Sequence, residues 1–176
     1  MRRALLWLPL AGFVLLFAVV ASGLLKPNDH LVHSQMVGEQ LPHFDLPAMV
    51  PGMPGVDTAL FADGKPRLIN VFASWCIPCM AESPQLMELK QEGVEIDAVA
   101  VRDTPANIVG FLKRFGNPYT RIGDDRQSAF QLALGSSGVP ETYVVDGKGR
   151  IVEQHIGDVR AEDVPDLLAA LGKARG

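Results

Sequence analysis

The chain has 176 residues, of which 16 are Lys or Arg and 20 are Asp or Glu. Its N-terminus is apolar, and the region that follows, residues 38–176, is long enough for a single domain. Because Arg2, Arg3, Lys26 and Asp29 precede residues 38–176, that region holds 13 basic and 19 acidic side chains and shows no basic stripe, which excludes a typical nucleic-acid-binding domain. Two cysteines are too few for a disulfide-stapled scaffold or for a zinc site closed by cysteines alone.

An uncharged apolar run opens the chain, from Ala4 to Leu25. A helix of about 20 residues crosses a bilayer, so this run predicts one N-terminal transmembrane helix through residues 4–25. Arg2 and Arg3 precede the run, and positive charge favours the cytoplasmic side, so we expect a cytoplasmic N-terminus and an exported domain, periplasmic in a bacterium. A cleaved signal peptide ending near Ala21 is the alternative, although its apolar region is usually shorter, about 7–15 residues.

The expected organisation is therefore an anchor at residues 1–25, a tether at 26–37 and one domain at 38–176. Apolar runs and chain breakers predict these elements in order: short extended pieces near Phe44–Leu46 and at Thr58–Phe61, a buried strand at Leu68–Ala73, a helix at Ile77–Gln91, a buried strand at Ile96–Val101, a helix from Pro105 to Phe115, a shorter helix at about Arg126–Leu134, hairpin strands at Thr142–Val145 and Arg150–Glu153, and a last helix through Val164–Leu171.

Helices between buried strands predict parallel pairing, and the Asp146–Gly149 turn predicts an antiparallel hairpin. The expected fold class is thus α/β, with a mixed central sheet flanked by helices.

Both cysteines stand in one Cys-x-x-Cys unit at the start of the predicted helix, Cys76 and Cys79. Residue Met80 replaces the histidine of a haem-attachment motif. Unpaired N–H groups at a helix start favour a Cys76 thiolate, and Pro78 suits the first turn. Cys79 shares a helix face with Leu86 and should point inward, so it can resolve a mixed disulfide formed by Cys76. A packed cysteine pair, or half of a metal site, remains the alternative at this point.

The motif and its surroundings resemble the thioredoxin superfamily: Trp75–Cys79, Pro84 in the following helix, and Gly138–Thr142 ahead of the hairpin. The resemblance implies a thioredoxin-like fold in which Pro140 is a cis-proline beside the active site. It also implies that the backbone of Val139 pairs with the substrate peptide.

Finer features resemble one branch, the membrane-anchored reducing proteins of cytochrome c maturation, the CcmG/DsbE type. They are the anchor, Leu68–Cys79, Ala81-Glu82, Gly116–Tyr119 and Pro140–Thr142, and the resemblance runs from about Gly38 to the C-terminus. It implies a thiol:disulfide oxidoreductase that reduces the disulfide of apocytochrome c, or of a haem-ligation chaperone, before haem attachment.

The same resemblance implies the remaining partners. A membrane thiol-reductant transporter would supply electrons, and the inner membrane would hold residues 4–25. The redox-active disulfide Cys76–Cys79 would serve without a further cofactor or a metal.

One position departs from ordinary thioredoxins, which carry a buried Asp six residues before the first cysteine. Here that position is Asn70, which cannot titrate. Glu82, three residues after Cys79, and Glu141, after the expected cis-proline, are the candidates to replace it. Carboxylates near Cys76 raise the pKa of its thiol and make the dithiol more reducing, so we hypothesise that both glutamates tune the site.

Four other functions remain open to different degrees. A peroxidase of the peroxiredoxin class would carry Thr at the position of Ala73. A Sco-like copper carrier would have three residues between its cysteines, where this chain has two. It would also need a distant histidine ligand, for which His155 is the candidate. A disulfide-forming oxidant usually has His between its cysteines, where this chain has Ile77-Pro78. A sibling reductase for another client, such as copper-site assembly in cytochrome oxidase, differs only in loop surfaces.

Overall fold

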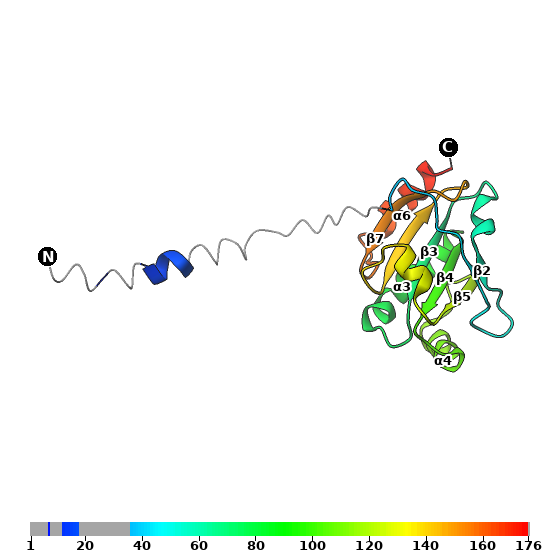
Figure 1. Cartoon of the computed structure of the whole chain (residues 1–176), viewed down its shortest axis with the longest axis horizontal. Coiled ribbons are helices and arrows are strands. Elements are labelled where there is room, and N and C mark those ends of the chain that lie inside the picture. The colour runs from blue at the N-terminus through cyan, green and yellow to red at the C-terminus, as the bar shows by residue number, and fades with distance from the viewer. Residues whose placement is uncertain (1–6, 8–11, 18–35, 176) are drawn as a thin grey trace. The chain divides into compact units, whose positions relative to one another are not determined.

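The computed structural model describes residues 7, 12–17 and 36–175 (Figure 1). The chain divides into two compact units, Met1–His33 and Ser34–Gly176. Among the described residues, of which 12–17 are helical, no helix has the length and apolarity needed to cross a membrane. Most of the predicted anchor at 4–25 and of the predicted tether at 26–37 lies outside the described residues.

A five-stranded mixed sheet forms the centre of the second unit, in the order β5-β4-β3-β6-β7 (Figure 1). Its strands are β3 (Arg67–Phe72), β4 (Ile96–Val101), β5 (Arg121–Asp125), β6 (Glu141–Val145) and β7 (Ile151–Ile156). β3, β4 and β5 are parallel to one another, whereas β6 is antiparallel to both β3 and β7. The predicted α/β class with a mixed sheet is confirmed.

The parallel strands are connected by α3 (Ile77–Gln91) and α4 (Pro105–Phe115), whereas α5 (Ala129–Ala133) lies between β5 and β6, and α6 (Val164–Lys173) follows β7. α3 packs against both α4 and α6. Two right-handed crossovers that step in the same direction put their helices on one face of a sheet, which is why α3 and α4 are neighbours.

The N-terminal part of this unit carries β1 (Asp45–Leu46), β2 (Val56–Asp57) and the short 3-10 helix η1 (Thr58–Ala62). The Phe44 ring packs against Phe61 and against Phe130 of α5, with ring centroids 6.1 and 3.9 Å apart. These aromatic side chains form one part of the buried core.

Strand β5 was not among the predicted elements. Its sequence, Arg121–Asp125, has one large apolar residue, Ile122, and a glycine, which is a weak strand pattern. Tertiary packing compensates, because Gly123 bridges to Ala48 and lies so close to Leu46 that an added Cβ would be 2.8 Å from the Leu46 Cβ.

Two further predictions are wrong in detail. Thr58–Phe61 is not extended but belongs to η1, because the Asp57 carboxylate accepts a hydrogen bond from the Ala59 N–H at 2.7 Å and starts a helical turn. The helix expected at about Arg126–Leu134 is only α5, because Ser128 has a φ of 56° and interrupts helical geometry before Ala129.

Strand β3 determines where the reactive unit lies. All six of its residues are buried, as expected for a central strand with neighbours on both sides. The Phe72 ring at its end packs against Phe111 of α4 and against Tyr119, with centroids 5.5 and 4.8 Å apart. The chain leaves the core just beyond Phe72 and enters α3 at the cysteines.

Candidate active site

The two cysteines form a disulfide at the start of α3, with their Cα atoms 5.2 Å apart. Cys76 is the N-cap residue, and its sulfur accepts a hydrogen bond from the Cys79 N–H at 3.1 Å. Pro78 lies in the first turn, where its missing N–H removes no helical hydrogen bond. Cys76 is 4% exposed and Cys79 1%, so Cys76 is the more accessible sulfur-bearing residue of a largely buried pair.

The two sequence neighbours of Cys76 are exposed apolar residues. Trp75 is 52% exposed and Ile77 is 77% exposed. The indole N–H of Trp75 donates to the Arg102 carbonyl at 3.3 Å, and the Ser74 N–H donates to the Asp103 carboxylate at 2.6 Å. These bonds attach the loop before the cysteines to the turn that follows β4.

The Val139–Pro140 peptide bond is cis, as the family resemblance implies. β6 begins directly after it and pairs Glu141 with Val71 of β3, so the loop that contains this bond lies by the end of β3 that leads to Cys76. In the described part of the chain, neither the N–H nor the C=O of Val139 has a hydrogen-bond partner. The backbone of Val139 is therefore available to another polypeptide.

A buried polar network lies under the cysteine helix. Asn70 donates from its amide nitrogen to Glu82 Oε1 and to Thr142 Oγ1, each at 3.0 Å, and accepts from the Tyr119 hydroxyl at 2.9 Å. The Val159 N–H donates to Glu82 Oε2 at 3.1 Å. Asn70, Glu82 and Thr142 have no exposed surface, so Glu82 is not a solvated helix-face charge.

The pKa of Glu82 is raised to about 7, mainly by burial; the hydrogen bonds from the Val159 N–H and from Asn70 lower it, and the charge of Asp158 adds a smaller rise. Burial, together with the Glu82 charge, also raises the pKa of Tyr119 well above its usual value. Glu82 lies one helical turn beyond Cys79, on the same buried side of α3. A carboxyl group that gains and loses a proton near neutral pH is thus placed beside the inner cysteine.

Glu141 is also buried, at 1% exposed, but it has a different environment. Its Oε1 accepts from the N–H and the hydroxyl of Ser137 at 2.8 and 2.7 Å, and its Oε2 accepts from the Tyr143 hydroxyl at 2.6 Å and the Gln154 amide at 3.0 Å. These four donors connect the loop before the cis bond to β6 and β7.

His155, the histidine considered for a copper site, lies in β7 opposite Thr142. Its Nε2 is 3.2 Å from the Asp158 carbonyl and 3.7 Å from the Asp163 carboxylate. Across residues 7, 12–17 and 36–175, no three His, Cys, Asp or Glu side chains form a group that could hold a metal ion.

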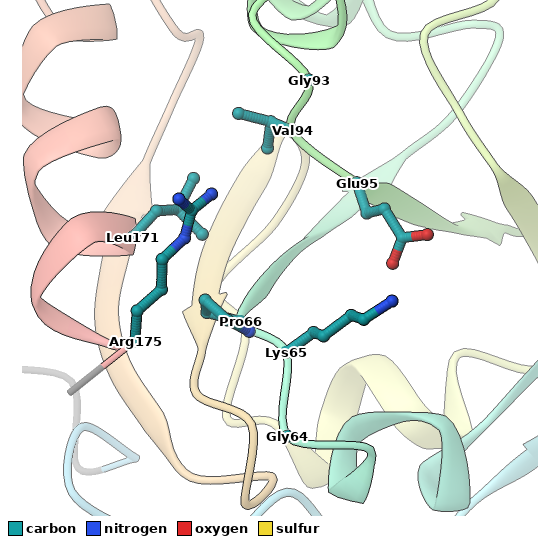
Figure 2. Close-up of a pocket in the computed structure, with 8 residues that line it drawn as sticks. All are labelled: Gly64, Lys65, Pro66, Gly93, Val94, Glu95, Leu171 and Arg175. Carbon is teal, nitrogen blue, oxygen red and sulfur yellow. The ribbon is translucent and has the colours of Figure 1, made fainter.

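A pocket of about 430 Å³ lies at the other end of the parallel strands (Figure 2). It is lined by the segments that lead into β3 and β4, with Lys65 and Glu95 among them, and by Leu171 and Arg175 at the end of the chain. The cysteines follow the opposite end of β3, so this pocket is separate from the disulfide.

Three residues of the network were not predicted as site residues: Val159, Tyr119 and Thr142, the last of which belongs to the Pro140–Thr142 segment of the family resemblance. Val159 contributes only its backbone N–H, from 77 residues beyond Glu82, and no side-chain pattern indicates such a contact. Tyr119 belongs to the Gly116–Tyr119 segment that the family resemblance includes, which is the available signal for it.

Several known proteins are similar to this chain in sequence or in fold. Residues 36–171 match the model of the Redoxin family. The chain is 40% identical to the thiol:disulfide interchange protein HelX of Rhodobacter capsulatus, over 96% of this chain and 98% of HelX, and 34% identical to DsbE of Vibrio cholerae, over 97% and 95%. A crystal structure of a DsbE from Chlorobium tepidum has a TM-score of 0.66 at 23% identity, over 80% of this chain and 98% of that one.

Proposed function

Because the chain belongs to the DsbE/HelX family of thiol:disulfide interchange proteins, we propose that it is a membrane-tethered reductant of the disulfide in apocytochrome c, or in the chaperone that presents it. The observation that carries this proposal is the disulfide at the start of α3, with Glu82 beside its inner cysteine and the free backbone of Val139 nearby.

The exchange begins with the reduced protein. The Cys76 thiolate attacks one sulfur of the client disulfide, and the other client sulfur leaves as a thiolate. The hydrogen bond from the Cys79 N–H and the positive end of α3 stabilise the Cys76 thiolate before the attack. The product of this step is a mixed disulfide between Cys76 and the client.

Cys79 then resolves the mixed disulfide. Its thiol gives up a proton, its sulfur attacks the Cys76 sulfur, and the client is released with both cysteines reduced while the Cys76–Cys79 disulfide forms. Glu82 supports this step, because a carboxylate with a pKa of about 7 can accept the Cys79 proton at neutral pH. Asn70 orients that carboxylate and cannot itself take the proton.

The remaining parts of the proposal concern location and partners. Residues 4–25 anchor the protein in the inner membrane, with the N-terminus in the cytoplasm and residues 38–176 in the periplasm. A membrane thiol-reductant transporter returns electrons to the disulfide, and the cysteine pair needs no added cofactor. The support is the charge asymmetry around the apolar run together with the family.

A trapping experiment tests this function. Full-length Cys79→Ser protein should accumulate a mixed disulfide with an oxidised peptide that contains an apocytochrome Cys-x-x-Cys-His motif, because resolution is blocked. Cys76→Ser should form none. Equal trapping by both variants, or by neither, would contradict the assigned roles of the two cysteines.

The reduction potential separates a reductant from an oxidant. Equilibration of the full chain with glutathione should give a value well below about −180 mV, whereas a disulfide-forming oxidant lies near about −120 mV. A sibling reductase for another client would show the same potential but no preference for the apocytochrome peptide over an unrelated disulfide peptide.

A further inference from the structure

Tyr119 lies between the aromatic core and the polar network under α3. It is 4% exposed, and its ring packs against Phe72 at the end of β3. Hydrogen bonds also hold the turn that leads to it: the Tyr119 N–H donates to Asn117 Oδ1 at 3.0 Å, and Lys90 Nζ of α3 donates to the Asn117 carbonyl at 2.8 Å. The ring is thus held from both sides, and its hydroxyl has a defined place.

The hydroxyl of Tyr119 donates to the atom of the Asn70 amide that does not bond to Glu82. This atom is Asn70 Oδ1, at 2.9 Å. The amide nitrogen of Asn70 donates one N–H to Glu82 Oε1 and the other to Thr142 Oγ1. An asparagine side chain has two N–H donors and one acceptor oxygen, so each of these groups in Asn70 has a partner.

The opposite orientation of the Asn70 amide is unfavourable while Glu82 is charged. A half-turn of the amide exchanges its oxygen and its nitrogen, which differ little in size. The oxygen would then face the Glu82 carboxylate, so that two acceptors would meet with no hydrogen between them. The orientation of Asn70 therefore decides whether Glu82 has a donor there, and the Tyr119 hydroxyl supplies the bond that completes the favourable orientation.

The titratable and charged groups around Glu82 come from three parts of the fold. Cys79 is one turn away on α3, Tyr119 precedes β5, and Asp158 follows β7. β3 and β6 contribute uncharged polar side chains. Burial, and then the Glu82 charge, raises the pKa of Tyr119 well above its usual value, so its hydroxyl keeps the proton that it donates. Tyr119 therefore acts on Glu82 through a neutral hydrogen bond and not by charge.

We propose that Tyr119 is a positioning residue of the active site: its hydroxyl fixes the orientation of the Asn70 amide, so that an N–H group points at Glu82 and stabilises the carboxylate that accepts the proton. That proton leaves the Cys79 sulfur and goes to a Glu82 oxygen, and the negative charge moves to the sulfur that then attacks Cys76. This inference rests on the proposed function, in which Glu82 takes the proton of Cys79.

The test is Tyr119→Phe, which removes the hydroxyl and keeps the ring. The measurement is the protonation midpoint of the Glu82 carboxyl group, followed by carbon-13 NMR of the oxidised full-length protein in detergent, where the bonded cysteines do not titrate. The signal is assigned by its absence in Glu82→Gln. The wild-type midpoint should lie near pH 7.

The midpoint should be higher in Tyr119→Phe. The charged form of Glu82 then requires an Asn70 oxygen without its donor, whereas a protonated Glu82 can give its O–H to that oxygen after the amide turns. We expect a rise of about one pH unit, a tenfold higher proton affinity, which is the effect of about one hydrogen bond.

Tyr143→Phe is the matched control. Tyr143 is also buried, and its hydroxyl donates to the other buried glutamate, Glu141, at 2.6 Å. This variant should leave the Glu82 midpoint at its wild-type value. In an Asn70→Leu background, Tyr119→Phe should cause no further rise, because the effect passes through the Asn70 amide.

An unchanged midpoint in Tyr119→Phe, an equal rise in Tyr143→Phe, or a rise that persists in the Asn70→Leu background would overturn this inference and leave the reductant function standing. Failure of the trapping experiment with Cys79→Ser would instead overturn the reductant function, and the Glu82 midpoint would still decide whether Tyr119 positions Asn70.

Discussion

At the residue scale, the site depends on one carboxyl group kept away from water. Glu82 is held by donors from β3 and from the segment after β7, and it lies on the buried side of α3 with Cys79. Neither donor carries a full positive charge, so burial dominates and the pKa rises. The residue is therefore suited to proton transfer rather than to an ion pair.

The pH dependence of stability follows from this pKa. The folded protein holds the Glu82 proton up to about pH 7, whereas the unfolded chain releases it near 4.5. The contribution of Glu82 to the free energy of unfolding should therefore be highest at low pH. It should fall by about 3 kcal/mol as the pH rises from about 4.5 through 7. Urea unfolding of the oxidised protein between pH 4.5 and 8 measures this loss.

Glu82→Gln should remove the loss, because the amide does not titrate. The matched control is Glu88→Gln, an exposed position on the same helix, which should keep the wild-type pH profile. Parallel profiles for wild type and Glu82→Gln would show that folding does not raise the pKa of Glu82.

The reduction potential gives a second prediction for this residue. A carboxylate near the cysteines disfavours a thiolate, so Glu82→Gln should make the potential less negative by about 30 mV at pH 8, which corresponds to about one pKa unit. The difference from wild type should disappear near pH 5.5, where Glu82 is protonated. An unchanged potential in both Glu82→Gln and Glu141→Gln would refute the hypothesis that these glutamates tune the site.

At the element scale, charged groups secure the strand ends opposite the cysteines. Arg67, at the start of β3, is 2% exposed and bonds to Asp97 of β4 at 3.3 Å and to Glu95 at 3.2 Å. Asp97 also pairs with Arg121 of β5 at 3.2 Å. Three parallel strands are thus joined by one buried network.

Arg67→Met should destabilise the domain by about 3–5 kcal/mol, because Asp97 remains buried with one of its two partners removed. Arg126→Met removes a pair of the same type, but Arg126 is mostly exposed, so the loss there should be below about 1 kcal/mol. Chemical denaturation of both variants compares the two pairs directly. Equal losses would mean that burial contributes little to the Arg67 network.

The individual helices and strands also show how much of the fold could be predicted from the sequence. Continuous apolar runs identified β3 and β4, and helical spacing identified α3, α4 and α6, because these elements bury a periodic face. β5 could not be recognised, since its pairing with β4 and its contact with Leu46 compensate for a polar sequence. In the site, the cysteines and Pro140 follow from a local motif. The hydrogen bond between Val159 and Glu82 does not, because it joins residues 77 positions apart.

At the scale of the whole molecule, two halves of the sheet supply different parts of the site. The parallel half leads into the cysteine helix, and the antiparallel half carries the cis bond and the backbone of Val139. Under the proposed function, a client held between them needs residues 38–176 alone, so the N-terminal segment should affect where the protein acts and not its redox chemistry.

Cell fractionation tests whether the N-terminal segment determines location without affecting the redox chemistry. The full chain should stay with membranes after alkaline carbonate extraction, because residues 4–25 span the bilayer as proposed. Replacement of residues 1–25 by a cleavable signal peptide should give a soluble periplasmic protein with the wild-type reduction potential. A native chain that is soluble and begins after Ala21 would show instead that the segment is a signal peptide.

The pairing of β3 with β6 also has a consequence for the order in which the parts of the domain can assemble. Asn70 contacts Thr142, 72 residues later, so the central strand gains its second neighbour only after most of the domain has emerged. Cys76 and Cys79 precede β6 in the chain, so under the proposed export they would reach the periplasm before the strand that completes their surroundings. A chain that ended after β5 would hold the complete cysteine motif but lack the loop that contains the Val139–Pro140 bond.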